Sequence, residues 1–275
     1  MRLAAVLLAW VLMAGGATAC PGLDPCTVEG GAYYALPPPG WDGSSPLPAT
    51  IFFHGYKAPA AGFARDEPFR AAFAAEGVLL VLPVGINDTW AHHGSPSQAR
   101  DELAFMDAVR ADLLDRLPID THRLLVTGFS QGGSMVWELA CYRGRDYTAF
   151  APIAGAFWEP LPASCPGGPI DLRHVHGTRD RTVPMAGRPI AGRFHQGDVL
   201  RSLAILRRAD SCAEAPDRAE NEPAGLVCEI WKRCSSGREM RLCLHGGEHI
   251  MPTGWVASIH RWARGLQGWG RDAPG

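Results

Sequence analysis

Short, continuous apolar runs alternate with amphipathic helical patterns along most of this chain. Apolar runs of strand length occur at residues 49–53, 77–83, 122–129, 150–157 and 171–176. Strands that are apolar on both faces belong to a parallel sheet that helices cover on both sides. The sequence therefore predicts an α/β fold with a mostly parallel sheet. In such sheets the chemistry lies at the carboxyl ends of the strands.

The remaining predicted elements complete this pattern. An early strand covers residues 33–36, and two further strands, 226–233 and 239–245, flank a Ser-Ser-Gly turn. Helical periodicity predicts helices over residues 63–76, 100–117, 131–143, 197–208 and 255–266. We find no internal repeat and no linker, so residues 20–275 are expected to form a single catalytic domain.

Composition excludes two classes of protein. Hydrophobic residues make up 47% of the chain and charged residues 20%, which argues against disorder. The formal net charge is −2, with 26 Lys and Arg against 28 Asp and Glu, and no basic stripe is present. A nucleic-acid-binding protein usually has such a stripe, so we expect no nucleic-acid partner.

The first 19 residues have the pattern of a signal peptide. Arg2 precedes an apolar run over residues 3–13, and the small residues Ala17-Thr18-Ala19 form a cleavage site before Cys20. A lipid anchor on Cys20 is the alternative, but such signals usually have a Leu-like residue at the position of Ala17. The remaining chain has no apolar stretch long enough to span a membrane. We therefore expect a secreted or periplasmic protein without a membrane span.

Eight cysteines in an exported chain predict four disulfides. Two of them, Cys228 and Cys243, are equidistant from the turn between the last two predicted strands, so they face each other in an antiparallel pair. The full predicted set is Cys20–Cys26, Cys141–Cys165, Cys212–Cys234 and Cys228–Cys243. No paired C-x2-C unit occurs, and His92-His93 has no third ligand at a suitable spacing, so we expect no metal site.

A G-x-S-x-G motif, Gly128-Phe129-Ser130-Gln131-Gly132, joins the predicted strand 122–129 to the helix after it. A sharp strand-to-helix turn needs small flanking residues, and it raises the serine hydroxyl above the sheet. The alternative is a glycine-rich turn with an incidental serine. The context favours Ser130 as a nucleophile.

A serine nucleophile needs a base and an acid that orients the base, in the chain order Ser, Asp or Glu, His. Asp180 follows the strand 171–176, and His249 follows the last strand in a glycine-flanked loop. We predict these two as the acid and the base. The alternatives that we considered are Asp171, Glu248, Asp101 and Glu102 for the acid, and His245, His174 and His176 for the base.

The tetrahedral intermediate that an attacking serine forms also needs two backbone N–H donors for its oxyanion. Gln131, the residue after the nucleophile, is predicted to supply one. The loop His54-Gly55-Tyr56 is predicted to supply the other, from Tyr56 or, as the second choice, Gly55. Trp90 and Trp158, together with Tyr56, are candidate substrate-binding aromatics, although tryptophans often only pack the core.

Four motifs together resemble the secreted polyhydroxybutyrate depolymerase/feruloyl esterase family of α/β-hydrolases. They are Phe53-His54-Gly55-Tyr56, the Ser130 elbow, His176-Gly177-Thr178-Arg179-Asp180 with Val183-Pro184, and Gly246-Gly247-Glu248-His249 with Pro252. Trp90 and Arg100-Asp101-Glu102 resemble a further aromatic and acidic feature of that family. The resemblance spans residues 30–266. It implies carboxylic-ester hydrolysis by Ser130, Asp180 and His249 without a cofactor.

The sequence therefore predicts a secreted serine esterase. Its expected substrates are small or oligomeric esters, either short polyesters such as hydroxybutyrate oligomers or feruloyl and acyl esters. Two alternatives remain, a serine peptidase of the same fold and a non-catalytic relative that binds a partner.

Overall fold

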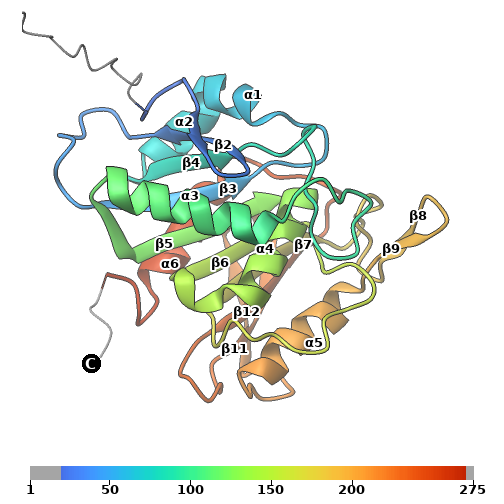
Figure 1. Cartoon of the computed structure of the whole chain (residues 1–275). Helices are drawn as coiled ribbons and strands as arrows, with labels where there is room; N and C mark the ends of the chain where they lie inside the picture. Colours follow the sequence, from blue (N-terminus) through green and yellow to red (C-terminus); the bar gives the residue numbers. More distant parts are fainter. Residues whose placement is uncertain (1–19, 271–275) are drawn as a thin grey trace, which may run out of the picture.

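The computed structural model describes residues 20–270 of the 275-residue chain. The predicted signal peptide, residues 1–19, lies outside the described residues. Within the described part, ten strands form one sheet in the order β1-β2-β4-β3-β5-β6-β7-β12-β11-β10, with helices on both faces (Figure 1). These strands are β1 (Cys26–Val28), β2 (Gly31–Leu36), β3 (Leu47–Phe53), β4 (Leu79–Pro83), β5 (Ile119–Phe129), β6 (Ala149–Ile153), β7 (Leu172–Gly177), β10 (Arg218–Glu222), β11 (Leu226–Trp231) and β12 (Met240–His245).

The centre of the sheet is parallel and its two ends are antiparallel. Strands β4, β3, β5, β6, β7 and β12 run parallel to their neighbours in that order. At one end β2 and β1 are antiparallel, and at the other end β11 and β10 are antiparallel. The predicted α/β architecture is confirmed. Its central strands have continuous apolar sequences because both of their faces are covered.

Helices form the two outer layers. They are α1 (Ala60–Arg65), α2 (Glu67–Ala74), α3 (Glu102–Arg116), α4 (Gln131–Tyr142), α5 (Val199–Ala209) and α6 (Trp255–Arg264). Side chains of α3, α4 and α5 share one apolar cluster, whereas α1, α2 and α6 pack on the opposite face. Successive side chains of strand β3 point to opposite faces of the sheet. Ile51 and Phe53 belong to the cluster under α3, α4 and α5, and Phe52 belongs to a cluster on the opposite face. Among residues 20–270, no helix has the length and apolar character that crossing a membrane requires.

The structure differs from the predicted elements in three places. The predicted helix 63–76 is two helices, because Asp66 is extended and its side chain accepts a hydrogen bond from the Phe69 N–H at the start of α2. The predicted strand 150–157 ends at Ile153, since Ala154 has a positive φ of 50°. The short strands β1 and β10, and the hairpin of β8 (Arg188–Ile190) with β9 (Phe194–Gln196), have no apolar run that would predict them.

Five strands bring their carboxyl ends to the same edge of the sheet. Phe53 at the end of β3 pairs with Gly128 of β5, and Phe129 pairs with Ile153 of β6. At the neighbouring strands, His245 of β12 pairs with Gly177 of β7. The loops that follow these strands, which contain most of the predicted site residues, therefore lie together.

Four disulfides join the eight cysteines, in the same four pairs that the sequence predicts. Cys228 and Cys243 pair directly across β11 and β12, with their Cα atoms 3.9 Å apart. In the described part of the chain, the two groups of acidic and cysteine side chains close enough to share an ion each contain one of these disulfides. Disulfide sulfurs are not thiolates, so each group offers a single carboxylate as a metal ligand.

Candidate active site

Ser130 lies at the turn between β5 and α4, where its backbone is strained. Its φ is 60° and its ψ is −121°, a conformation that costs free energy for a residue with a Cβ atom. The flanking glycines are needed because a side chain would not fit at either position. A Cβ atom on Gly132 would collide with the Phe53 carbonyl oxygen, and a Cβ atom on Gly128 would lie 2.7 Å from the Gly132 carbonyl oxygen. The Ser130 N–H donates to the Ile153 carbonyl oxygen at 2.9 Å, which ties the turn to β6. This is the strand-to-helix geometry that exposes a nucleophilic serine.

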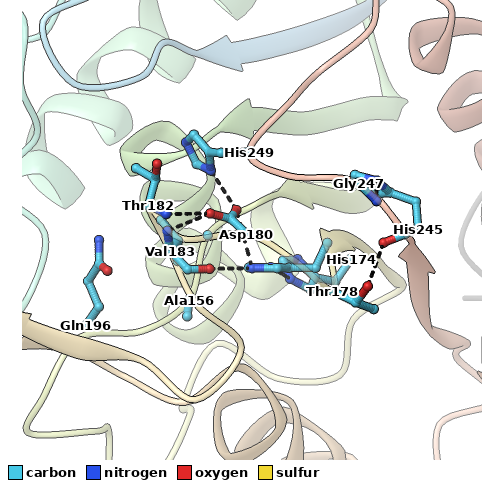
Figure 2. Close-up of polar contacts among 12 residues, drawn as sticks. Ala156, His174, Thr178, Asp180, Thr182, Val183, Gln196, His245, Gly247 and His249 are labelled. Atoms are coloured by element: carbon cyan, nitrogen blue, oxygen red, sulfur yellow. Dashed lines mark hydrogen bonds and ion pairs between the residues drawn. The ribbon is translucent and has the colours of Figure 1, made fainter.

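Asp180 lies in the loop after β7, with both of its carboxylate oxygens in hydrogen bonds (Figure 2). Oδ1 accepts the N–H groups of Thr182 and Val183, each at 2.8 Å, and Oδ2 lies 2.6 Å from Nδ1 of His249. Burial acts to raise the pKa of this carboxyl, but the hydrogen bonds from His249 and the Val183 N–H outweigh it and lower the pKa. The carboxylate is therefore ionised at neutral pH and can only accept.

The tautomer of His249 follows from this contact. Because the Asp180 carboxylate only accepts, Nδ1 of His249 must carry a proton, and Nε2 of the neutral ring then has its lone pair free. The imidazole lies against Phe129, the residue before Ser130, with ring centroids 4.6 Å apart. The Asp180–His249 pair thus lies beside the Ser130 turn, with the basic nitrogen opposite the carboxylate.

The loops after β7 and β12 are joined by their backbones. The Thr178 N–H donates to the His245 carbonyl oxygen at 2.9 Å, and the Arg179 N–H donates to that of Gly247 at 3.1 Å. A Cβ atom on Gly177 would lie 2.5 Å from the Glu248 carbonyl oxygen. Glycine at position 177 therefore allows the close approach that brings His249 to Asp180.

The alternatives for the acid lie elsewhere or make other contacts. Asp171 is near the amino end of β7, where it accepts hydrogen bonds from Arg238 at 2.8 Å and from the Glu239 N–H at 2.7 Å. Glu102 is buried and pairs with Arg100 at 2.6 Å, while Asp101 caps α3 through the Ala104 N–H. Glu248 is exposed.

The alternatives for the base are also engaged. Nδ1 of His245 accepts the Gly247 N–H at 3.1 Å. His174 and His176 are fully buried in β7 and bond to each other. Of the histidines that we considered, His249 is the one that contacts Asp180 within hydrogen-bond distance.

The loop after β3 approaches the serine closely. A Cβ atom on Gly55 would lie 3.4 Å from the Ser130 Cβ atom, so the backbone at Gly55 borders Ser130. The backbone N–H of Tyr56 has no hydrogen-bond acceptor among the described residues. Gln131 begins α4, so its N–H has no intrahelical acceptor. Neither of the two predicted oxyanion donors therefore has a backbone acceptor among the described residues.

Trp90 requires a correction. It was predicted to contact substrate, but its side chain is completely buried and its Nε1–H donates to the His54 carbonyl oxygen at 2.8 Å. Its ring packs edge-on against Phe53, with centroids 5.0 Å apart. Trp90 therefore stabilises the loop after β3 from within the core. Trp158 is also buried, against His92, whereas Tyr56 is 65% exposed.

Sequence reasoning missed the residues that hold the two donor loops together. The Gln131 side chain donates to the Trp90 carbonyl oxygen at 3.2 Å and accepts from the Thr89 hydroxyl at 2.9 Å. Nε2 of His54 accepts the Gly85 N–H at 3.2 Å, and burial lowers the pKa of His54, so this ring stays neutral. No motif marks Thr89 or Gly85, because they reach the site only through the fold.

The chain is similar in sequence to known esterases over part of its length. No protein-family model matches the chain. Feruloyl esterase D of Neurospora crassa is 30% identical over 178 residues, which cover 63% of this chain and 54% of that protein. Feruloyl esterase C of Emericella nidulans is 28% identical over 167 residues, 58% of each chain. The chain thus spans little more than half the length of these relatives.

Solved structures show the same fold at low identity. An acetyl xylan esterase from Aspergillus awamori aligns with a TM-score of 0.61 at 13% identity, over 85% of this chain and 93% of that one. A phospholipase/carboxylesterase from Dyadobacter fermentans aligns with a TM-score of 0.53 at 15% identity, over 84% of this chain and 95% of that one. The chain thus has the α/β-hydrolase fold, and over part of its length it is similar in sequence to feruloyl esterases.

Proposed function

We propose that this protein hydrolyses carboxylic esters with Ser130 as nucleophile, His249 as general base and Asp180 as the residue that orients His249. The main observation in support is the 2.6 Å contact between Asp180 Oδ2 and His249 Nδ1 beside the strained Ser130 turn. The esterases among its relatives support the same reaction class. Residues 20–275 would act as one catalytic domain, without a cofactor.

In acylation, Nε2 of His249 takes the proton of the Ser130 hydroxyl while Oγ attacks the ester carbonyl carbon. The tetrahedral intermediate carries one negative charge on its oxygen, which the N–H groups of Gln131 and Tyr56 would receive. His249, now positive, is stabilised by the ionised Asp180. The proton on Nε2 then passes to the leaving alcohol as the carbon–oxygen bond breaks, and an acyl-serine remains.

Deacylation repeats these steps with water in place of the alcohol. His249 removes a proton from water, the resulting hydroxide adds to the acyl carbon, and the second tetrahedral intermediate forms at the same oxyanion donors. Its collapse returns the proton from Nε2 to the Ser130 oxygen and releases the carboxylic acid. Each cycle thus consumes one ester and one water, and the enzyme is unchanged.

For the substrate class we propose aromatic acyl esters of the feruloyl type rather than hydroxybutyrate polymers. Relatives with the name feruloyl esterase support this choice. Tyr56 has an exposed ring and directly follows Gly55, whose backbone borders Ser130. A phenolic acyl group could stack on this ring with offset or edge-on geometry, which stabilises aromatic pairs by about 1 kcal/mol.

We also propose that the protein works outside the cytoplasm, either secreted or in a periplasm. Four disulfides among the described residues support this location, because such bonds persist in oxidising compartments.

The test is an ester panel under one set of conditions: p-nitrophenyl acetate and butyrate, methyl ferulate, acetylated xylan, hydroxybutyrate oligomers and a p-nitroanilide peptide. We expect turnover of the esters, with the highest kcat/KM on methyl ferulate, and no cleavage of the anilide. A Ser130→Ala variant is the background control. Turnover that survives in this variant, or anilide cleavage at a rate equal to that of the esters, would overturn the proposal.

A further inference from the structure

Strand β7 contains two buried histidines that form a chain of three polar contacts. His174 and His176 lie two positions apart, so both side chains point to the same face of the sheet. Nδ1 of His174 lies 3.0 Å from the Pro152 carbonyl oxygen, Nε2 of His174 lies 2.9 Å from Nδ1 of His176, and Nε2 of His176 lies 2.7 Å from the Val183 carbonyl oxygen. Both residues are completely buried.

These three contacts need three protons. A carbonyl oxygen can only accept, so each outer contact requires a proton on the histidine nitrogen. The central contact joins two ring nitrogens and also requires one proton between them. Two neutral imidazoles carry only two protons, so in the neutral pair one contact must place two lone pairs face to face. All three contacts are satisfied only when the pair carries one additional proton and a charge of +1.

The surroundings contain a negative partner for that charge. Nε2 of His176 lies 3.7 Å from Oδ2 of Asp180, the same oxygen that His249 contacts, and the Asp180 side chain is completely buried. The other titratable groups that act on His176 are His245 and His249, and Trp137 of α4 packs against His174. Burial opposes the charge and lowers the pKa of both histidines, but the carboxylate and the third contact favour it.

We propose that His174 and His176 are positioning residues that hold three protons between them, so that the pair is a buried cation beside the Asp180 carboxylate. This proposal rests on the proposed triad only for its catalytic consequence. The cation keeps Asp180 ionised, and it repels the positive form of His249. His249 therefore stays neutral, and able to accept the Ser130 proton, to a lower pH than it would beside an uncharged pair.

The first test measures the protons directly and does not need any activity. The wild-type protein is labelled with ¹⁵N in its histidine rings, and the nitrogen shifts and N–H couplings are recorded at pH 7. We expect one coupled pair of rings with three protonated nitrogens, including a strongly deshielded shared proton. The signals are assigned by their loss in His174→Gln. Two neutral rings, with one proton each, would overturn the proposal whether or not the protein hydrolyses esters.

The second test removes the charge but keeps the contacts. Glutamine at position 174 is neutral, and its two amide protons can serve the Pro152 oxygen and Nδ1 of His176. In His174→Gln, we expect the acid-side fall of kcat/KM for p-nitrophenyl butyrate to move to higher pH by about two units, as expected for the loss of a nearby charge at an effective dielectric of about 20. The kcat at high pH should change less than about threefold, because His249 is neutral there in both proteins.

His260→Gln is the matched control. His260 is another buried histidine, which lies in α6 and contacts Thr50 at 3.3 Å rather than Asp180. We expect its pH profile to match the wild type. Superimposable profiles for His174→Gln and wild type, or an equal shift in His260→Gln, would refute the charged pair. If the profile cannot be measured because no ester is hydrolysed, the proposed function fails and the ring-nitrogen experiment still decides the inference.

Discussion

Replacing Asp180 with asparagine should disable the enzyme while leaving its shape intact. In the wild type, the N–H groups of Thr182 and Val183 both donate to Oδ1, so this position requires an oxygen. An asparagine will therefore keep its amide oxygen there and turn its NH₂ group toward His249. A donor then faces Nδ1 of His249 where the carboxylate accepted, and the ring must move its proton to Nε2.

The size of the effect follows from this reversed contact. A histidine with a proton on Nε2 cannot accept the Ser130 proton, and it also loses the negative charge 2.6 Å from Nδ1. In other serine hydrolases the same substitution lowers kcat by about 10⁴. At ~1.4 kcal/mol for each factor of ten, this corresponds to about 5.5 kcal/mol of lost transition-state stabilisation. We expect KM to change little, because Asp180 is buried away from solvent.

The assay is steady-state hydrolysis of p-nitrophenyl butyrate at pH 8, with the active fraction titrated by a serine-directed phosphonate. The titration matters because deamidation of the new asparagine regenerates the wild-type aspartate. Wild-type enzyme at one part in 10⁴ would give a rate equal to that expected for the variant itself. Circular dichroism and a thermal melt check that the variant is folded.

Two carboxylate variants serve as controls. Asp171→Asn alters a buried aspartate near the other end of β7, and Glu248→Gln alters the residue next to His249. Both should retain kcat within about threefold. If Asp180→Asn keeps more than a tenth of the wild-type kcat, or if Glu248→Gln is inactive, the assignment of Asp180 is wrong.

Three further predictions follow from the structure. Ser130→Ala should reduce ester turnover to the uncatalysed rate with an unchanged or higher melting temperature, since the strained turn loses only a hydroxyl; residual saturable activity would contradict the assignment. Burial lowers the pKa of His92 and of His260 to about 4, so the unfolded chain binds more protons than the folded one below pH ~6.5, and each histidine should lower the free energy of unfolding by about 3 kcal/mol at pH 4. Urea unfolding between pH 7 and pH 4 measures this loss, and the free energy of unfolding should depend less on pH in His260→Gln. Removal of the Cys228–Cys243 bridge by a double alanine substitution should destabilise the protein by about 3 kcal/mol in the same assay, for a closed loop of 15 residues.

The sequence by itself determined the elements whose signal is local. Continuous apolar strands identified the parallel sheet, and three glycine-rich motifs at strand ends identified Ser130, Asp180 and His249 as candidates. The Cys228–Cys243 pair could be predicted because a hairpin register depends only on the position of its turn. The sheet and this disulfide are confirmed, because their physical constraints act within about twenty residues, and the three site residues stay predictions.

Only the tertiary structure decided between residues that satisfy the same pattern. Asp171 and Asp180 both lie near the predicted strand 171–176, but one end of β7 faces Arg238 and the other faces His249. Trp90 was assigned to substrate from its residue type, and it is instead buried beneath the loop after β3, because burial depends on contacts with Phe53 and His54 that are distant in sequence. The contacts of Thr89 with Gln131, and of Asp180 with His249, form only when separate strands align their carboxyl ends.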